Sequence, residues 1–303
     1  MENLTELLTR DEKAIFTLRA LYNKYGYSQY KMSKFEEYDL YVKNKDFLPS
    51  ENIITFTDTD GRLLALKPDV TLSIIKNSRI TSGVIKAQYN ENIYRISKGT
   101  NSFKEFMQVG LECLGEVGNE ELTEVILLAA KSLDLISESN VLEISHLDIT
   151  YGVLEYAGVS DEGKAKILDC LGKKNVAGIE LVCNAETIGK EKTDLVKMLA
   201  TIYGSPDNVL KNLELFKVTP DIENAIKQLN YIFAVLKQNG ISERLCIDFS
   251  LVGDMKYYNG IAMKGFVDGI PSGILSGGQY DNMMLKMHKN AKGVGFAVYL
   301  DDL

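Results

Sequence analysis

The sequence predicts one α+β domain, in which an antiparallel sheet is completed by both ends of the chain around a helical insertion. Strand-like runs of alternating apolar and polar residues occupy the stretch before residue 150 and return after residue 244. Between about residues 151 and 240 the apolar residues recur at helical spacing, with little strand signal. We therefore expect a single domain over residues 1–303, with the helical insertion at about 151–240.

The N-terminal segment predicts a helix and a hairpin. Apolar residues at helical spacing predict an amphipathic helix from near Thr5 to Tyr25, followed by Gly26. Tyr27 to Tyr41 mixes aromatic and charged residues, so it is either a strand followed by a short turn or a segment that pairs with a second copy of the chain. An Asp-Gly pair between alternating apolar runs predicts a hairpin of residues 53–57 and 62–66.

Helical spacing and strand alternation of the apolar residues predict the remaining elements. Pro68 and the polar residues after it indicate the start of a helix. Beyond it we expect strands at Val84 to Ile96 and Phe103 to Leu114, a helix at Glu120 to Ile136 and a strand at Val141 to Leu147. The insertion predicts helices near Glu162 to Leu171, Glu191 to Tyr203, Asp207 to Phe216 and Asp221 to Gln238. The last part predicts strands at Arg244 to Leu251, Gly260 to Val267, Ile274 to Gly277 and Gly293 to Tyr299, with a short helix at Tyr280 to Met287.

The composition is that of a soluble globular protein, with 45% hydrophobic and 25% charged residues. A net charge of −8 argues against a broad nucleic-acid-binding face. The four cysteines form no CxxC pair, so we expect no metal site and free thiols in a reducing cytoplasm. No run approaches about 18 uninterrupted apolar residues, and the N-terminus has no secretory pattern, so we expect no association with a membrane.

Polar residues stand at unusual places in two of these elements. In a regular strand Gln108 and Glu112 share one face, and by default such a face meets water. Asp69 and Thr71 stand at a predicted helix start, where their default role is capping. Spacing alone therefore leaves an ordinary structural interpretation open for all four residues.

Two glycine- or tyrosine-rich stretches lie near the C-terminus. In DMKYYNG the adjacent Tyr257 and Tyr258 would point to opposite faces of a strand. The glycines of SGGQYD and KGVGFAVYLDDL allow close backbone approach, to a ligand or to another strand, and GxG without a third glycine excludes a dinucleotide fingerprint. The two histidines, His146 and His288, have no nucleophile partner in the pattern, which favours a structural role for each.

Five stretches in order resemble the catalytic core of class II aminoacyl-tRNA synthetases, specifically histidyl-tRNA synthetase. LKPDVTL resembles the family's LRPEGTA, YRISKGTNSFKEFMQVGLE its motif 2, LVGDMKYYNG its LVRGLDYYN, SGGQYD its AGGRYD, and GVGFAVYLDDL its motif 3, usually GFAxGLERL. The resemblance covers nearly the whole chain. It implies a class II synthetase-like antiparallel sheet flanked by helices, and since the chain stops at motif 3 we expect no anticodon-binding domain and no tRNA ligand.

The departures from the family pattern fall on residues that handle ATP. Gly253 replaces an arginine that helps to activate the amino acid, and Asp302 replaces the motif 3 arginine that clamps ATP. Arg95 matches the first arginine of motif 2 and is a residual nucleotide-site position. Adenylyl transfer needs cations to stabilise its spreading negative charge, so we expect no catalytic residues and no cofactor.

The resemblance implies that the amino-acid pocket is retained. The positions that match the family's histidine-binding residues are Asp69, Thr71, Gln108, Glu112, Tyr257, Tyr258 and Tyr280. Asp69 replaces a glutamate, and Lys256 stands where the family has an aspartate. Carboxylates suit an α-ammonium group, and amide and hydroxyl groups suit an imidazole or a carboxylate.

A synthetase-like core without catalysis is similar to the regulatory subunits of ATP phosphoribosyltransferase, which act in the first step of histidine biosynthesis. That resemblance implies a homodimer, a hetero-oligomer with the short catalytic subunit and allosteric control by histidine. Two alternatives stay open. One is an amino-acid adenylating or ligase enzyme on the same fold, with Lys256 or Arg95 replacing the missing arginines, and the other is a stand-alone amino-acid sensor.

Overall fold

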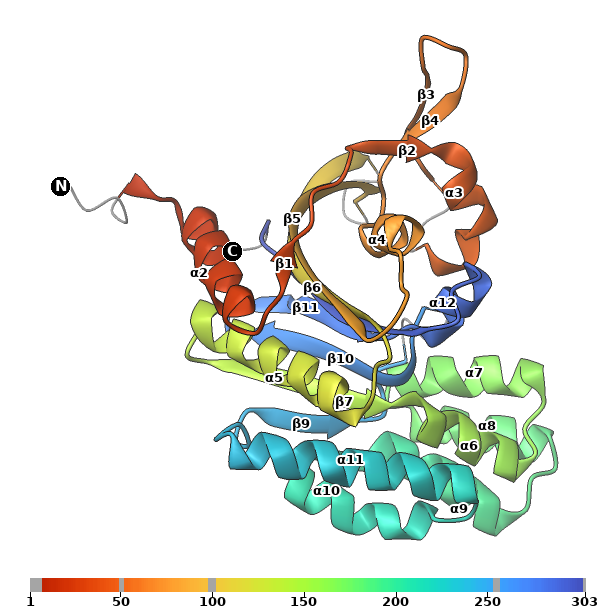
Figure 1. Ribbon diagram of the computed structural model, residues 1–303. Helices are drawn as coiled ribbons and strands as arrows, with labels where there is room; N and C mark the ends of the chain where they lie inside the picture. The colour runs from red at the N-terminus through yellow and green to blue at the C-terminus, as the bar shows by residue number, and fades with distance from the viewer. Residues whose placement is uncertain (1–6, 49–51, 98–101, 253–256, 302–303) are drawn as a thin grey trace.

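The computed structural model describes residues 7–48, 52–97, 102–252 and 257–301 (Figure 1). Its centre is a nine-stranded sheet in the order β1-β5-β6-β12-β11-β10-β7-β9-β8. Strands from the first half of the chain therefore lie beside strands from the last 45 residues, as the sequence predicts. The sheet is mostly antiparallel, but β1 pairs with β5 and β7 with β9 in parallel, which the sequence prediction of an antiparallel sheet missed.

The longest strand pair is β5 (Val84–Ile96) with β6 (Phe103–Gly115). The other neighbour of β6 is β12, from the C-terminal part, which also pairs with β11 of the β10–β11 hairpin. The other strands of this sheet are β1 (Ser28–Gln29), β7 (Asn140–His146), β8 (Tyr203–Gly204), β9 (Leu245–Asp248), β10 (Asn259–Val267), β11 (Ile270–Gln279) and β12 (Lys292–Tyr299).

Each face of this sheet has its own hydrophobic core. On one face β6 packs Val109, Leu111 and Cys113 with α5 (Asn119–Ile136) and α2 (Arg10–Lys24). On the other face Leu114 joins a second cluster with α4 (Thr71–Asn77) and α12 (Asp281–Lys286). Since side chains alternate along a strand, the even-numbered positions of β6 face α4 and α12.

A second, three-stranded sheet in the order β2-β4-β3 stands at the edge of the domain. The predicted hairpin is confirmed as β3 (Thr55–Thr57) with β4 (Leu63–Leu66). The segment between Tyr27 and Tyr41 forms β1, β2 (Phe35–Glu37) and the start of α3 (Tyr38–Lys43), which a 3-10 turn at Lys45–Phe47 follows.

Between β7 and β9 the chain is mostly helical, and two of these helices were not predicted from the sequence. These are α6 (Leu147–Ala157) and α8 (Val176–Ala185). α6 follows β7 without a turn residue between them, and α8 contains three β-branched residues, which weakens the helical pattern of each, although Gly158 ends α6 and the Asn175 side chain caps α8. The other elements are α7 (Asp161–Gly172), α9 (Lys190–Thr201), α10 (Pro206–Asn212), a 3-10 turn at Leu213–Phe216 and α11 (Pro220–Gln238).

Among the described residues, no helix combines the length and the apolar character that crossing a membrane requires.

Candidate functional site

A cavity of about 700 Å³ opens on the face of the sheet that carries α4 and α12. All seven residues that the synthetase resemblance assigns to an amino-acid pocket line it, together with Arg95. They come from four places in the fold: the start of α4, strand β6, the segment before β10, and the residue between β11 and α12. The structure therefore brings together side chains that are up to 211 positions apart in sequence, from Asp69 to Tyr280.

Glu112 is the most constrained carboxyl group of this cavity, with only 2% of the residue exposed. Thr71 Oγ1 donates to its Oε1 at 2.6 Å, and the Tyr280 hydroxyl donates to Oε2. Burial raises the pKa of Glu112 to about 8, against the two hydroxyl donors, which favour the ionised form. In the free protein at pH 7 the carboxyl group is therefore mostly protonated, and a cationic ligand group would ionise it.

The default interpretation of β6, with a polar face exposed to water, is wrong for its C-terminal half. Gln108 and Glu112 are both buried, whereas Glu105 near the loop end of the strand is exposed. The predicted sharing of a face by Gln108 and Glu112 is confirmed, because both side chains line the same cavity.

Two glycines of β12 hold the pocket side chains in place. A Cβ at Gly295 would lie 1.8 Å from Glu112 Oε2, and a Cβ at Gly293 would lie 2.2 Å from Cε2 of Tyr280. Gly295 is the register partner of Glu112. In the sequence, the alternation of Gly293 and Gly295 with Val294 and Phe296 predicts close packing rather than a functional role. In the structure, the missing side chains of Gly293 and Gly295 leave the space that the side chains of Tyr280 and Glu112 occupy.

Replacing Gly295 by alanine is expected to displace Glu112. The added methyl group would also meet Leu111 O at 2.4 Å, so the strand cannot accommodate it without a shift. Overpacking of this kind costs about 1–3 kcal/mol of unfolding free energy. Gly189→Ala is the matched control, because its Cβ meets nothing within 4 Å and its φ is −62°. Urea unfolding of both variants checks the prediction, and equal stability would contradict it.

Asp69 lies just before the N-terminal end of α4 and has two roles. Its Oδ1 accepts from the Leu72 backbone N–H at 2.9 Å, which confirms the capping interpretation. Its Oδ2 lies 3.4 Å from a terminal nitrogen of Arg95, whose Nε donates to Pro68 O at 2.5 Å. Burial raises the pKa of Asp69, and the Arg95 charge opposes that shift. Arg95 therefore contacts the Asp69 carboxylate and the Pro68 carbonyl, which both precede α4.

Three tyrosine rings form one wall of the cavity. The ring centroids of Tyr257 and Tyr258 lie 4.7 Å apart, and those of Tyr257 and Tyr280 lie 6.3 Å apart, both edge to face. The expectation that Tyr257 and Tyr258 point to opposite faces is wrong. β10 begins only at Asn259, so the alternation of a strand does not govern the two residues.

Several lining residues were missed from the sequence. Tyr89 of β5 and Phe296 of β12 sit on regular strands, and Tyr151 and Leu168 reach the cavity from α6 and α7. The helical insertion therefore contributes to the pocket wall. Only the packing of the insertion on the sheet reveals this, since nothing in its amphipathic pattern distinguishes a pocket residue from a core residue.

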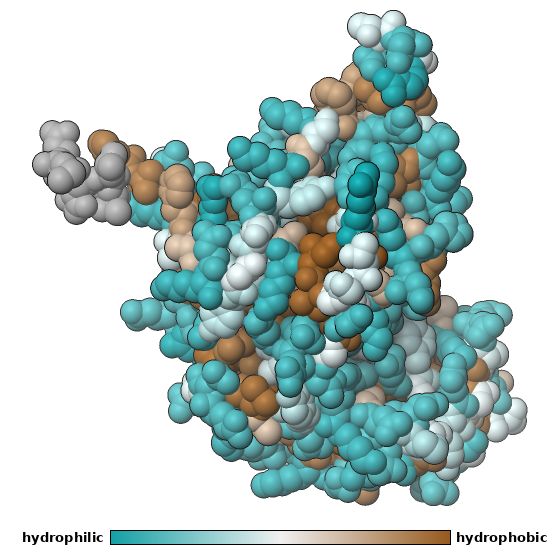
Figure 2. All heavy atoms as spheres, viewed as in Figure 1, coloured by the Kyte–Doolittle hydropathy of each residue, from teal (hydrophilic) through white to brown (hydrophobic). Residues whose placement is uncertain are grey.

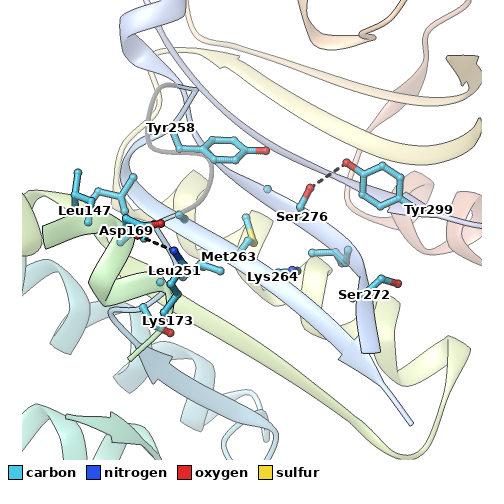
Figure 3. A pocket seen from close by; sticks show the side chains of 18 residues that line it. Leu147, Asp169, Lys173, Leu251, Tyr258, Met263, Lys264, Ser272, Ser276 and Tyr299 are labelled. Carbon is cyan, nitrogen blue, oxygen red and sulfur yellow. Dashed lines mark hydrogen bonds and ion pairs between the residues drawn. The ribbon is translucent and has the colours of Figure 1, made fainter. Parts of the chain in front are cut away.

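A second cavity of about 650 Å³ adjoins the first (Figure 3). Tyr258, Ser276 and Tyr299 line both cavities, and the Ser276 and Tyr299 hydroxyl groups are 3.1 Å apart. Figure 3 shows this hydrogen bond beside Tyr258, with Lys264 and Ser272 of the β10–β11 hairpin farther along. The first cavity thus continues toward α7 and that hairpin.

Three of the family departures, Gly253, Lys256 and Asp302, lie outside the described residues. Within the described ranges no group of three or more His, Cys, Asp or Glu side chains is arranged to hold a metal ion. His146 is buried at the end of β7, and His288 is exposed after α12.

A comparison with family models matches residues 3–303 to the model described as histidyl-tRNA synthetase. The chain belongs to the histidyl-tRNA synthetase family. Within this family it is similar to proteins named ATP phosphoribosyltransferase regulatory subunit. It is 29% identical over 292 residues to that of Ruminiclostridium cellulolyticum, covering 94% of this chain and 70% of the relative. It is 28% identical over 283 residues to that of Oceanobacillus iheyensis, covering 92% and 69%.

Solved structures of the histidyl-tRNA synthetase family share the fold. A Bacillus halodurans protein described as an ATP phosphoribosyltransferase regulatory subunit/histidyl-tRNA synthetase superposes with a TM-score of 0.86 at 23% identity, over 96% of this chain and 77% of that one. A chain of the ATP phosphoribosyl transferase complex from Thermotoga maritima gives a TM-score of 0.76 at 20% identity, over 96% and 97%. These likenesses confirm the predicted class II synthetase-like α+β fold.

Proposed function

We propose that this chain is a non-catalytic regulatory subunit of ATP phosphoribosyltransferase that binds histidine in the cavity around Glu112. The observation that carries the proposal is a cavity with two buried carboxyl groups and an aromatic wall, in a chain whose relatives bear the name of that subunit. As part of a biosynthetic enzyme, such a subunit would act in the cytoplasm.

The chemistry of the cavity suits a small amino acid with a basic group. A buried carboxyl group without a cation nearby is costly, and among the contacts of the described residues Glu112 has hydroxyl donors only. A ligand ammonium or imidazole would supply the missing positive charge or hydrogen-bond donor. Gln108 offers an amide to the polar groups of the ligand, and the three tyrosine rings keep water from it.

The absence of catalysis is supported by the arginine positions. Arg95 is paired with Asp69 and donates to Pro68 O, so part of its guanidinium group is already engaged and less available to phosphate groups. The replacement of two family arginines by Gly253 and Asp302 removes further cations from the chemistry.

A rate assay of the catalytic phosphoribosyltransferase tests the proposed function. Formation of phosphoribosyl-ATP is expected to rise when this chain is added, and histidine is expected to suppress that rise. No effect on the rate or on its histidine sensitivity would contradict the proposal. Steady exchange of pyrophosphate into ATP with any amino acid would instead favour an adenylating enzyme, and histidine binding without an effect on the transferase would favour a stand-alone sensor.

The chain is expected to form a homodimer. Strand β1 is the edge of the nine-stranded sheet, and Figure 2 shows hydrophobic residues gathered between β1 and α4 on a face that is otherwise mostly hydrophilic. Phe16 on the neighbouring α2 is 53% exposed. Sedimentation should give twice the mass of the chain, and Phe16→Glu should shift it toward the monomer. Tyr231→Glu on α11, where the side chain is 41% exposed, is the control. A monomer at micromolar concentration would contradict the prediction.

A further inference from the structure

A separate cavity of about 730 Å³ lies where β7 passes into α6, on the side that faces α11. His146 ends β7 and lines this cavity, as do Asp148 and Tyr151 of α6 and Gln228 of α11. None of the proposed histidine-binding residues lines it. The cavity is thus distinct from the amino-acid pocket, although Tyr151 lines both.

The hydrogen bonds around His146 determine which of its ring nitrogens carries the proton. Gln228 Nε2 donates to Asn119 Oδ1 at 2.6 Å, which turns Gln228 Oε1 toward the imidazole. That oxygen lies 2.9 Å from His146 Nε2 and can only accept, so Nε2 carries the hydrogen. Burial lowers the pKa of His146, and the ring is neutral at pH 7. His146 Nδ1 is consequently a hydrogen-bond acceptor.

This acceptor lacks a donor within the described part of the chain. His146 is 1% exposed, and its Nδ1 is buried without a hydrogen-bond partner there. Asp148 Oδ2, which lies 4.0 Å from Nδ1, is also an acceptor. A single nitrogen with two N–H groups can bridge two acceptors at this distance, because it can lie about 2.9 Å from each of them.

The charges at the cavity favour a cation. Asp148, Glu155 and Asp221 line it, against a single lysine, Lys227, which lies 2.9 Å from the Glu223 carboxylate. The aromatic rings of Tyr151 and Tyr156 complete the wall. A carboxylate cluster, a buried acceptor and tyrosine rings together suit an ammonium or guanidinium group.

We propose that this cavity is a second binding site, which takes an organic cation with N–H donors that bridge His146 Nδ1 and Asp148 Oδ2. The cation belongs either to a free alkylguanidine or to an arginine side chain of a peptide. Asp148 also accepts at 3.3 Å from the backbone N–H of Gly260, which lies two residues after Tyr258. A ligand bound to Asp148 in this second site would therefore affect the segment that carries Tyr257 and Tyr258, which line the cavity around Glu112.

Imidazole NMR of the full-length chain tests this site, because the protein has only two histidines. Agmatine, and separately the end-blocked peptide Gly-Gly-Arg-Gly-Gly, are titrated into ¹⁵N-labelled protein at constant ionic strength. We expect a saturable shift of the His146 Nδ1 resonance with at least one of the two probes. His288 is exposed and serves as the internal control. Agmatine alone producing the shift identifies a small cation, and a tighter peptide identifies a protein side chain.

Asp148→Asn is the decisive variant. It keeps an oxygen for the Gly260 N–H but removes the charge, and it should weaken binding at least tenfold. The control is Asp161→Asn, the same charge change at a fully exposed site at the start of α7, and it should leave binding within twofold. No shift of His146 with either probe, or the same affinity in Asp148→Asn as in the unaltered chain, would overturn the proposal.

Discussion

Histidine binding is expected to weaken at least a hundredfold when Glu112 is replaced by alanine. The carboxyl group is buried at the centre of the cavity, with Thr71 and Tyr280 directed at its two oxygens. Removing one partner of a buried, hydrogen-bonded charge pair costs roughly 3–5 kcal/mol, and about 1.4 kcal/mol corresponds to a factor of ten. The loss would also leave the Thr71 and Tyr280 hydroxyl groups without their acceptor. Calorimetric titration with histidine measures the effect.

Glu105→Ala is the matched control for this experiment. Glu105 is a glutamate on the same strand, but it is exposed and contacts the Tyr94 hydroxyl at 3.1 Å and the Asn92 amide. Its removal should change the affinity by no more than about twofold, as is usual for a surface ion far from the ligand. Similar losses in the two variants would mean that the face of β6 assigned to the ligand is wrong. Glu112→Gln, which keeps the side-chain shape, distinguishes lost charge from a disturbed fold.

Much of the fold follows from local periodicity. The β5–β6 pair, the β3–β4 hairpin and α5 each combine a clear hydrophobic period with turn or capping residues at their ends. The parallel pairings of β1 with β5 and of β7 with β9 could not be predicted in the same way. They join segments that are distant in sequence, and an edge strand of two residues has no period to detect.

The site was predictable in part. Parity along β6 places Gln108 and Glu112 on one face, but it does not say whether that face meets water. Burial comes from α4, α12 and the insertion, which cover the face in the folded protein. The same holds for Gly295: its pattern predicts close packing, but the register of β12 with β6 decides that an added Cβ would lie 1.8 Å from Glu112 Oε2.

The free energy of unfolding of the ligand-free protein is expected to fall as pH rises from about 5 to 8. Burial raises the pKa of Glu112 from 4.5 to about 8, so within this window the folded state binds a proton that the unfolded state has released. Stability changes with pH in proportion to the protons bound by the unfolded state minus those bound by the folded state, and this difference is negative here. Since one pKa unit is worth about 1.4 kcal/mol, the whole shift amounts to a few kcal/mol.

Other groups bear on the same curve. The raised pKa values of Asp69, Glu143 and Asp281 act in the same direction as that of Glu112. The lowered pKa of His146 acts in the opposite direction, because the unfolded state then holds the extra proton and stability rises with pH up to about 6.5. The contribution of Glu112 is therefore isolated by subtraction of a variant that differs only at this group.

Glu112→Gln is that variant, since an amide does not titrate, keeps an oxygen for one of the two hydroxyl groups of Thr71 and Tyr280, and offers an N–H to the oxygen of the other. Urea unfolding at several pH values between 5 and 8.5 should show a loss of stability toward high pH in the unaltered chain that is absent from Glu112→Gln. Saturating histidine should remove most of that loss, because a ligand cation stabilises the ionised carboxylate. The same pH slope in both proteins would show that Glu112 is already ionised in the free cavity at neutral pH, and a cation would then have to be present beside it before any ligand binds.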